Sequence, residues 1–182
     1  MSIDASALGA SDTLYFDGSK DPDGRYTIFG GAGDDTIVAG HNSTLFPGLG
    51  ADDIRLTAGG SGSNEADIFY TSAAESTGTG FDTIENMPLG KLSIPGFFAT
   101  GTTTTSGDTL DLANFDSELA TLVNGHFNGS TNVVEVLFAT VEGHGQTNLV
   151  VVDANGDHAY EAGIDYVFAT PGYFVNASDF GF

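Results

Sequence analysis

Short apolar runs alternate with clusters of Gly, Asp, Ser and Thr through the first part of the chain. Runs bounded in this way predict short β-strands, because glycine and aspartate favour the turns between strands. In the first 66 residues such runs lie at positions 13–16, 26–29, 36–38 and 53–57. The pattern continues at positions 67–70 and 82–84, so strand-rich sequence extends well beyond the first third of the chain.

One segment has the spacing of a helix. Asp116 is a suitable N-cap residue, and Gly125 is a suitable stop after the last turn. Between them, Leu119, Leu122 and Val123 form an apolar stripe. We therefore expect a single short helix at this point of the chain.

The sequence after this helix is more apolar and lacks alternation. The runs at 133–139 and 148–152 are typical of strands that are buried on both faces, and further runs lie at 164–168 and 173–175. We expect an all-β protein with at most one short helix. Residues 1–66 form a Gly/Asp-rich first region, and residues 67–182 form a β-rich region that resembles a β-sandwich.

Composition excludes several classes of function. The chain has 182 residues, of which 25 are acidic and 4 basic, giving a net charge of −21. This charge argues against binding to nucleic acid or to an anionic membrane surface. The chain has no cysteine, so thiolate chemistry is excluded. No apolar run approaches the roughly 20 residues of a transmembrane helix, and we expect no classical secretory signal at the N-terminus.

A nine-residue motif with glycine and aspartate is the most informative feature. Positions 30–38 read GGAGDDTIV and fit the pattern G-G-x-G-x-D-x-U-x, in which U is a large apolar residue. Positions 47–55 repeat it seventeen residues later, with Pro47 in place of the first glycine. Glycine turns present carbonyl oxygens and aspartate adds a carboxylate, so stacked turns offer the hard oxygens that Ca²⁺ prefers. We interpret Asp34, Asp35, Asp52 and Asp53 as calcium ligands rather than as paired catalytic carboxylates.

These motifs resemble the RTX family of calcium-binding secreted proteins. The resemblance implies a short parallel β-roll over residues 1–66, with Asp35 and Asp52 as side-chain ligands. It also implies that carbonyl oxygens near Gly30, Ala32, Pro47 and Leu49 complete the ligand shells.

Further segments resemble proteins exported by type I secretion. Positions 66–84 and 107–112 are similar to the sequence that flanks RTX repeats, and positions 177–182 are similar to uncleaved C-terminal export signals. The resemblance implies the type I secretion machinery as a partner and an extracellular location.

A second acidic loop follows the apolar run at 148–152. Asp153, Asn155, Asp157 and Glu161 place side-chain oxygens at intervals that resemble the first half of an EF-hand-type calcium loop. Ile164 stands where such a loop has its bidentate glutamate. The alternative is an ordinary Asn-Gly turn between two strands.

No catalytic motif accompanies these features, and we expect that the protein is not an enzyme. The four histidines are scattered, and the chain has no G-x-S-x-G segment. The sequence favours a secreted calcium-binding structural protein whose folding and self-assembly into a surface layer, matrix or fibre are triggered by extracellular calcium. Two alternatives are a C-terminal export module of a secreted enzyme and a small calcium-stabilised polysaccharide-binding or hydrolase domain.

Overall fold

A computed structural model describes residues 1–21, 24–40, 42–57, 66–87 and 90–181 of the chain. The described part is mostly β-strand with one short α-helix, which confirms the expected all-β class. No helix in these ranges is long and apolar enough to cross a membrane.

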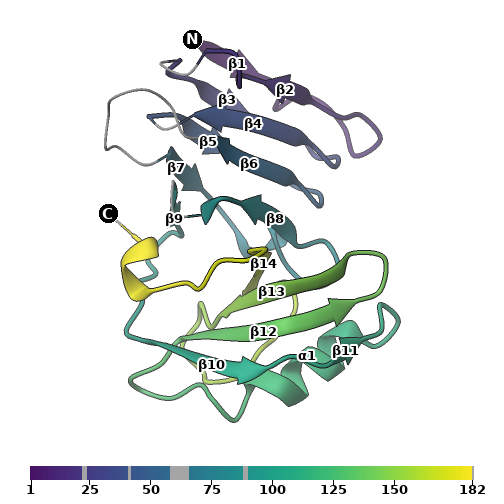
Figure 1. The fold of residues 1–182 in the computed structure, drawn as a ribbon, viewed down its shortest axis with the longest axis vertical. Helices are drawn as coiled ribbons and strands as arrows, with labels where there is room; N and C mark the ends of the chain where they lie inside the picture. The colour runs from purple at the N-terminus through teal and green to yellow at the C-terminus, as the bar shows by residue number, and fades with distance from the viewer. Residues whose placement is uncertain (22–23, 41, 58–65, 88–89, 182) are drawn as a thin grey trace.

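The first sheet is parallel throughout and contains every second strand of the first half of the chain (Figure 1). Its strands, in spatial order, are β1 (Ser2–Asp4), β3 (Thr27–Phe29), β5 (Thr44–Phe46), β7 (Ala66–Phe69) and β9 (Gly90–Ser93). The intervening strands are β2 (Tyr15–Asp17), β4 (Thr36–Gly40), β6 (Asp53–Thr57) and β8 (Asp82–Glu85), which pair in parallel in a second sheet. The chain therefore passes from one sheet to the other and back, and each passage adds one rung of two strands.

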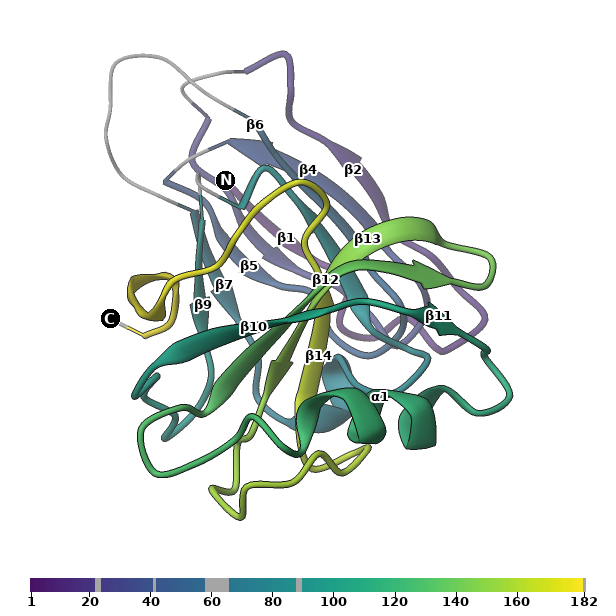
Figure 2. The same cartoon turned by 60° about the horizontal axis from the view of Figure 1, so that its bottom comes forward.

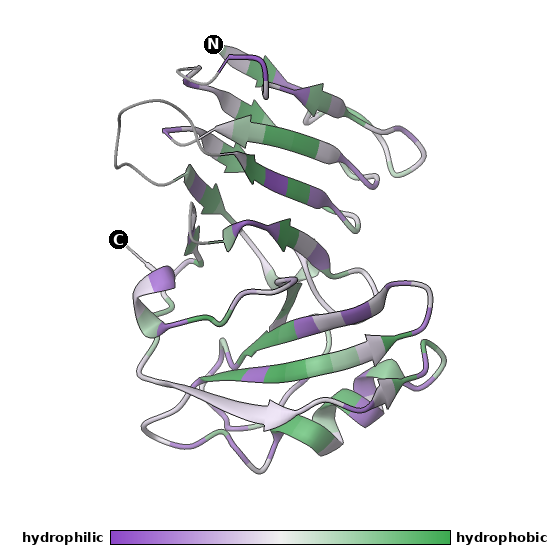
Figure 3. Ribbon diagram, viewed as in Figure 1, coloured by the Kyte–Doolittle hydropathy of each residue, from purple (hydrophilic) through white to green (hydrophobic). Residues whose placement is uncertain are grey.

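The core between the two sheets consists of two apolar columns. Side chains alternate between the two faces of a strand, so each strand turns some of its residues toward the space between the sheets. In the first sheet these residues are Ile28, Leu45, Ile68 and Leu92, and in the second they are Ile37, Ile54 and Ile84, all 0% exposed. Figure 3 shows hydrophobic residues in green along many of the strands, with hydrophilic residues in purple both on strands and in the connections. The rungs continue past residue 66 to β9, and the expected domain division at 66/67 stays a prediction.

The C-terminal strands extend the second sheet. They are β14 (Tyr166–Ala169), β13 (Gly145–Val152), β12 (Val133–Val141) and β10 (Thr102–Ser106), with β11 (Thr109–Leu110) also beside β12. β14 pairs with β8 in parallel, whereas β12, β13 and β14 pair in antiparallel. The expected sandwich-like second half therefore differs from the structure, because its strands join one sheet that is shared with the rungs.

Helix α1 (Phe115–Val123) covers one face of these C-terminal strands (Figure 2). Its buried residues Phe115, Leu119 and Val123 pack in the same cluster as Val134 and Val151. Because α1 covers one face and the rung core covers the other, the runs at 133–139 and 148–152 are apolar on both faces.

The start of α1 and one predicted strand need correction. Asn114 is the N-cap and Asp116 lies in the first turn, where its carboxylate accepts a hydrogen bond from the Tyr160 hydroxyl at 2.8 Å. The predicted strand at 173–175 is not a strand, because the Tyr173 amide turns back to the Thr170 carbonyl at 3.2 Å.

Candidate functional site

The two Gly-Asp motifs form equivalent turns that lead from the first sheet into the second. Asp35 immediately precedes β4, and Asp52 immediately precedes β6. A third aspartate, Asp82, opens β8 at the equivalent place in the next rung. All three side chains are buried, at 2%, 1% and 0% exposed. We refer to Asp35, Asp52 and Asp82 as the aspartate ladder.

Each member of the ladder accepts a hydrogen bond from the backbone of the preceding rung. Asp35 Oδ1 accepts from the Leu14 amide at 2.7 Å, and its Oδ2 accepts from the Gly31 amide at 2.7 Å. Asp52 Oδ1 accepts from the Asp35 amide at 2.8 Å, and Asp82 Oδ1 accepts from the Asp52 amide at 2.9 Å. The ladder thus ties the rungs together at the corner where the chain changes sheets.

The last member of the ladder connects the rungs to the C-terminal strands. The Tyr70 hydroxyl donates to Asp82 Oδ2 at 2.7 Å, and the Asp82 amide donates to Ser76 Oγ at 2.9 Å. The Ser76 hydroxyl in turn donates to the Val167 carbonyl of β14 at 2.5 Å. Buried hydrogen bonds of this kind fix the position of β8 beside β14.

The ladder concentrates negative charge in a buried place. Burial raises the pKa of Asp52 to about 7, although the Asp35 amide lowers it, and the charges of Asp35 and Asp34 raise it further. Burial and the nearby Asp52 carboxylate also raise the pKa of Asp82 well above its ordinary value. Asp52 Oδ2 is buried and, within the described part of the chain, has no hydrogen-bond partner. A buried acceptor without a donor is unfavourable by about 1–3 kcal/mol, so this oxygen is unusual.

The glycines of the motifs allow the turns to stack without any gap. A Cβ atom on Gly30 would lie 1.8 Å from the Pro47 carbonyl oxygen, and one on Gly33 would lie 2.1 Å from the Asp12 carbonyl oxygen. Gly48 has φ +104°, and a Cβ there would lie 2.1 Å from the Gly31 carbonyl oxygen. Carbonyl oxygens therefore stand between successive rungs, where only glycine leaves room for them.

The other residues predicted in the motifs have separate roles. Asp34 is exposed and its Oδ1 accepts from the Ala51 amide at 2.9 Å. Asp53 lies 3.4 Å from the Arg55 guanidinium, which also pairs with Glu85 at 2.6 Å. The side chain of Ala32 is half-buried and that of Leu49 is exposed. Because both side chains are hydrocarbons, only their backbone carbonyls could serve as cation ligands.

The second acidic loop joins β13 to β14, in the C-terminal half of the fold. Asp153 is buried, and its two oxygens accept from the amides of Gly156 at 2.7 Å and His158 at 3.0 Å. The exposed side chains of Asn155 and Asp157 hydrogen-bond each other at 3.0 Å, and Glu161 is exposed. The structure thus brings Asp153, Asn155 and Asp157 into one loop but engages both Asp153 oxygens with backbone amides.

A buried aspartate next to Ile164 organises this loop. Asp165 accepts from the Ala154 amide at 2.9 Å and from the Glu161 amide at 2.8 Å, and burial raises its pKa to about 6. Across the described ranges, no group of three or more His, Cys, Asp or Glu side chains is placed to hold a metal ion. A cation at either place would therefore depend on backbone carbonyl oxygens as well as carboxylates.

Asp82 is the ladder member that sequence reasoning missed as a site residue. Positions 77–85 read TGTGFDTIE and carry the motif spacing, with Thr77 in place of the first glycine. Positions 66–84 resemble the sequence that flanks the repeats, which is why this copy was not recognised as part of the site.

Comparison of the chain with known protein families and with curated proteins finds no match. The class of protein is therefore defined by its geometry. It is a mostly-β protein in which buried aspartates tie stacked glycine turns together.

Proposed function

We propose that the protein is a secreted calcium-binding structural protein whose first half is a short parallel β-roll of the RTX kind. The alternation of strands between two sheets supports the roll, because each rung contributes one strand to each sheet. The stacked glycine turns support it independently, since they repeat at the same corner of successive rungs.

The observation that carries the calcium proposal is the unpartnered oxygen of Asp52. It is buried among acidic groups, and the nearby amides of Gly31 and Asp35 are already engaged with Asp35 Oδ2 and with Asp52 Oδ1. Asp35 and Asp52 would supply carboxylate oxygens, and the carbonyls of Gly30, Ala32, Pro47 and Leu49 would supply the rest. Such an all-oxygen set suits calcium, which takes six to eight oxygens in flexible geometry. Bound calcium would supply the positive charge that the ladder lacks.

Binding of this kind would couple folding to calcium. Without a cation, burying the charged ladder opposes folding, because desolvation disfavours ionised carboxylates. Low intracellular calcium would then keep the chain open for type I secretion, and extracellular calcium would fold it. In this proposal the protein is not an enzyme.

Calcium is expected to stabilise the protein strongly. At a hundredfold excess over Kd, one site contributes about 2.7 kcal/mol, which corresponds to a rise in Tm of about 5–10 °C for a protein of this size. The measurement is thermal unfolding in excess EGTA and in millimolar calcium, with magnesium at equal ionic strength as a control. Asp52→Asn should lose most of the shift, whereas Asp108→Asn, an exposed carboxylate in the C-terminal half, should keep it. Coincident melting curves with and without calcium would contradict the proposal.

Calcium is also expected to promote self-association through the edges of the first rung. β1 and β2 are the outermost strands of their sheets, and such edges add strands readily. Sedimentation velocity in calcium should show species larger than the monomer, and EGTA should dissolve them. Tyr15→Lys should weaken association, because Tyr15 lies on β2 and is 72% exposed. Phe98→Lys, at a residue that is 74% exposed elsewhere, is the matched control. A monodisperse monomer in millimolar calcium would refute self-assembly while leaving calcium binding intact.

A further inference from the structure

Three stacked phenylalanines cross the outer face of the first sheet. Phe29, Phe46 and Phe69 are the last residues of β3, β5 and β7, next to the inward-pointing apolar column. The rings of Phe29 and Phe46 are 4.6 Å apart at 7°, and those of Phe46 and Phe69 are 5.0 Å apart at 19°. Because the rings pack face to face, the faces between neighbouring rings are covered. The three rings together form a continuous apolar column.

This column forms the floor of a groove of about 410 Å³, which we call the phenylalanine groove. One wall consists of the glycine turns, including Gly30 and Gly48, whose lack of side chains keeps it low. Leu49, which is 44% exposed, stands on the same wall. Ser6 lines the groove beside β1 and Glu75 lines it beyond β7, so these two residues lie toward opposite ends of the column.

The Glu75 carboxylate lines one end of the groove, and the Asp4 carboxylate lies next to the other end, bonded to Ser6. The Ser6 amide and hydroxyl donate to Asp4 Oδ1 at 3.1 and 2.6 Å, and these bonds lower the pKa of Asp4, so it is ionised at neutral pH. At the other end, Glu75 accepts from the Thr71 amide at 2.7 Å and from the Thr71 hydroxyl. The charge of Glu75 also raises the pKa of Asp52 and Asp82, which shows that it lies close to the aspartate ladder.

No positive charge balances these groups in the groove itself. Its lining contains neither lysine nor arginine among the residues that the structure describes. The whole chain has 4 such residues against 25 acidic ones. An anionic ligand is therefore repelled, and a purely apolar ligand would cover these carboxylates without supplying a positive charge to balance them. The complementary ligand has an apolar stem and a cationic head.

We propose that the phenylalanine groove binds lysine side chains of a basic segment in a partner protein. A lysine stem is apolar along its methylene groups and places its ammonium in water or on a carboxylate. Stems lying across the edges of Phe46 and its neighbours would bring ammonium groups to Asp4 at one end and to Glu75 at the other. The proposal does not require calcium, although the groove and the candidate calcium turns share Gly30, Gly48 and Leu49.

The test uses a labelled peptide of alternating leucine and lysine, with a leucine–glutamate peptide of equal length as the reference. Fluorescence anisotropy on the full chain should show binding of the lysine peptide only, weakened by added salt. Amide chemical shifts should change at Phe29, Phe46, Phe69 and Thr71. Both titrations are run in EGTA and in calcium, so a failure of calcium binding is recognised separately from a failure of the groove.

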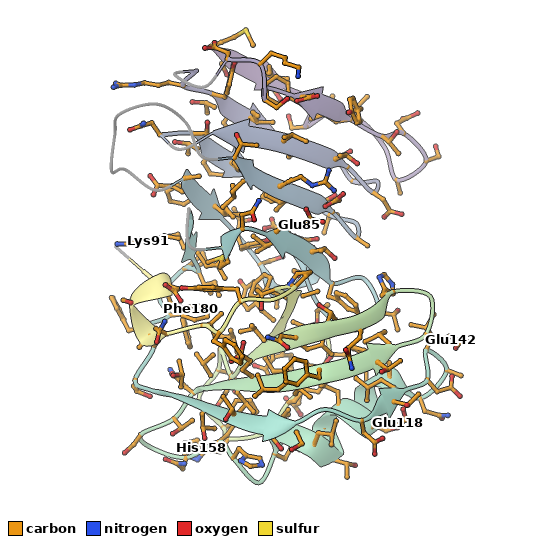
Figure 4. The ribbon with its side chains drawn as sticks, viewed as in Figure 1. Glu85, Lys91, Glu118, Glu142, His158 and Phe180 are labelled. Carbon is orange, nitrogen blue, oxygen red and sulfur yellow. The ribbon has the colours of Figure 1, made fainter. Side chains whose placement is uncertain are left out.

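The matched variants are Glu75→Gln and Glu142→Gln. Glu75→Gln keeps an oxygen for the Thr71 amide but removes the charge, and it should weaken binding of the lysine peptide about five- to tenfold. Glu142 is exposed and lies in the C-terminal half (Figure 4), so its substitution should leave binding unchanged. Equal affinity of the two variants, or equal binding of the glutamate peptide, would overturn the proposal. Shift changes confined to other parts of the chain would overturn it as well.

Discussion

Gly30→Ala is expected to lower the free energy of unfolding by more than about 3 kcal/mol. The reason is contact between backbones, because the new Cβ would lie 1.8 Å from the Pro47 carbonyl oxygen and 2.8 Å from its carbon. Neither atom is the end of a flexible side chain. Relief therefore requires that two rungs move apart, which would also break the hydrogen bond from the Asp35 amide to Asp52 Oδ1. The measurement is urea unfolding followed by circular dichroism.

Substitutions at two other glycines distinguish this backbone contact from the general effect of replacing glycine with alanine. A Cβ added at Gly125 would have no atom within 4 Å, and the residue has no positive φ, so Gly125→Ala should change stability by no more than about 0.5 kcal/mol. Gly143 also faces open space but has φ +79°, so Gly143→Ala should lose about 1–2 kcal/mol through backbone strain alone. If Gly30→Ala proved as stable as Gly125→Ala, the stacking of the turns would be wrong.

The strands that the sequence predicted best are apolar runs that are long or are bounded by turn-forming residues. The run at 53–57 coincides with β6, and the apolar runs at 133–139 and 148–152 fall within β12 and β13. The strands that were missed carry little apolar signal of their own. β5 has the sequence TLF, in which a single residue, Leu45, points into the core. β10 is polar along its whole length and is a strand because it pairs with β12 at the edge of the sheet.

The long-range arrangement could not be predicted from local pattern. The C-terminal run at 164–168 predicts a strand, and β14 is that strand, but nothing in it indicates pairing with β8. The pairing depends on the bond from Ser76 to Val167, between residues 91 positions apart. Such a contact joins the C-terminal strands to the rung sheet, where the sequence favoured a separate sandwich.

The candidate site was predicted in part. The motif spacing placed Asp35 and Asp52 together, and the structure brings them to adjacent rungs, 17 residues apart and joined by the Asp35 amide. The sequence did not indicate that backbone amides occupy both oxygens of Asp35 and of Asp153, because those donors depend on the turn conformation. The calcium assignment itself stays a prediction.

The second large expected effect is on the pH dependence of stability, and it comes from a buried glutamate. Glu135 lies in β12 between Val134 and Val136, is 1% exposed, and has an Oε1 atom with no partner in the described part of the chain. Burial raises its pKa to about 7, although the Val175 amide and the Asn148 side chain lower it, and the Asp179 charge raises it further. No positively charged group contributes to its pKa, so ionisation is opposed by desolvation.

The direction of the effect follows from the difference in the pKa of Glu135 between the unfolded and the folded protein. In the unfolded chain a glutamate has a pKa of about 4.3, whereas the folded protein holds Glu135 at about 7. Between these values the folded state binds the proton more tightly, so stability falls as the pH rises from about 4.3 to about 7 and then levels off. Glu135 alone should account for a loss of about 3–4 kcal/mol across this window.

Glu135→Gln is therefore expected to stabilise the protein at pH 8 and to be nearly neutral at pH 4.5. Glutamine retains an acceptor for the Val175 amide but does not titrate, so its stability curve should be flatter by about 3–4 kcal/mol. Asp52 and Asp165 have pKa values raised to about 7 and about 6 in both proteins, and their contributions cancel in the difference. Urea unfolding at intervals from pH 4 to pH 8 measures that difference, with Glu142→Gln as the exposed control. Curves for the wild type and Glu135→Gln that run parallel over the whole range would show that Glu135 is ionised in the folded protein, which its burial without a positive partner opposes.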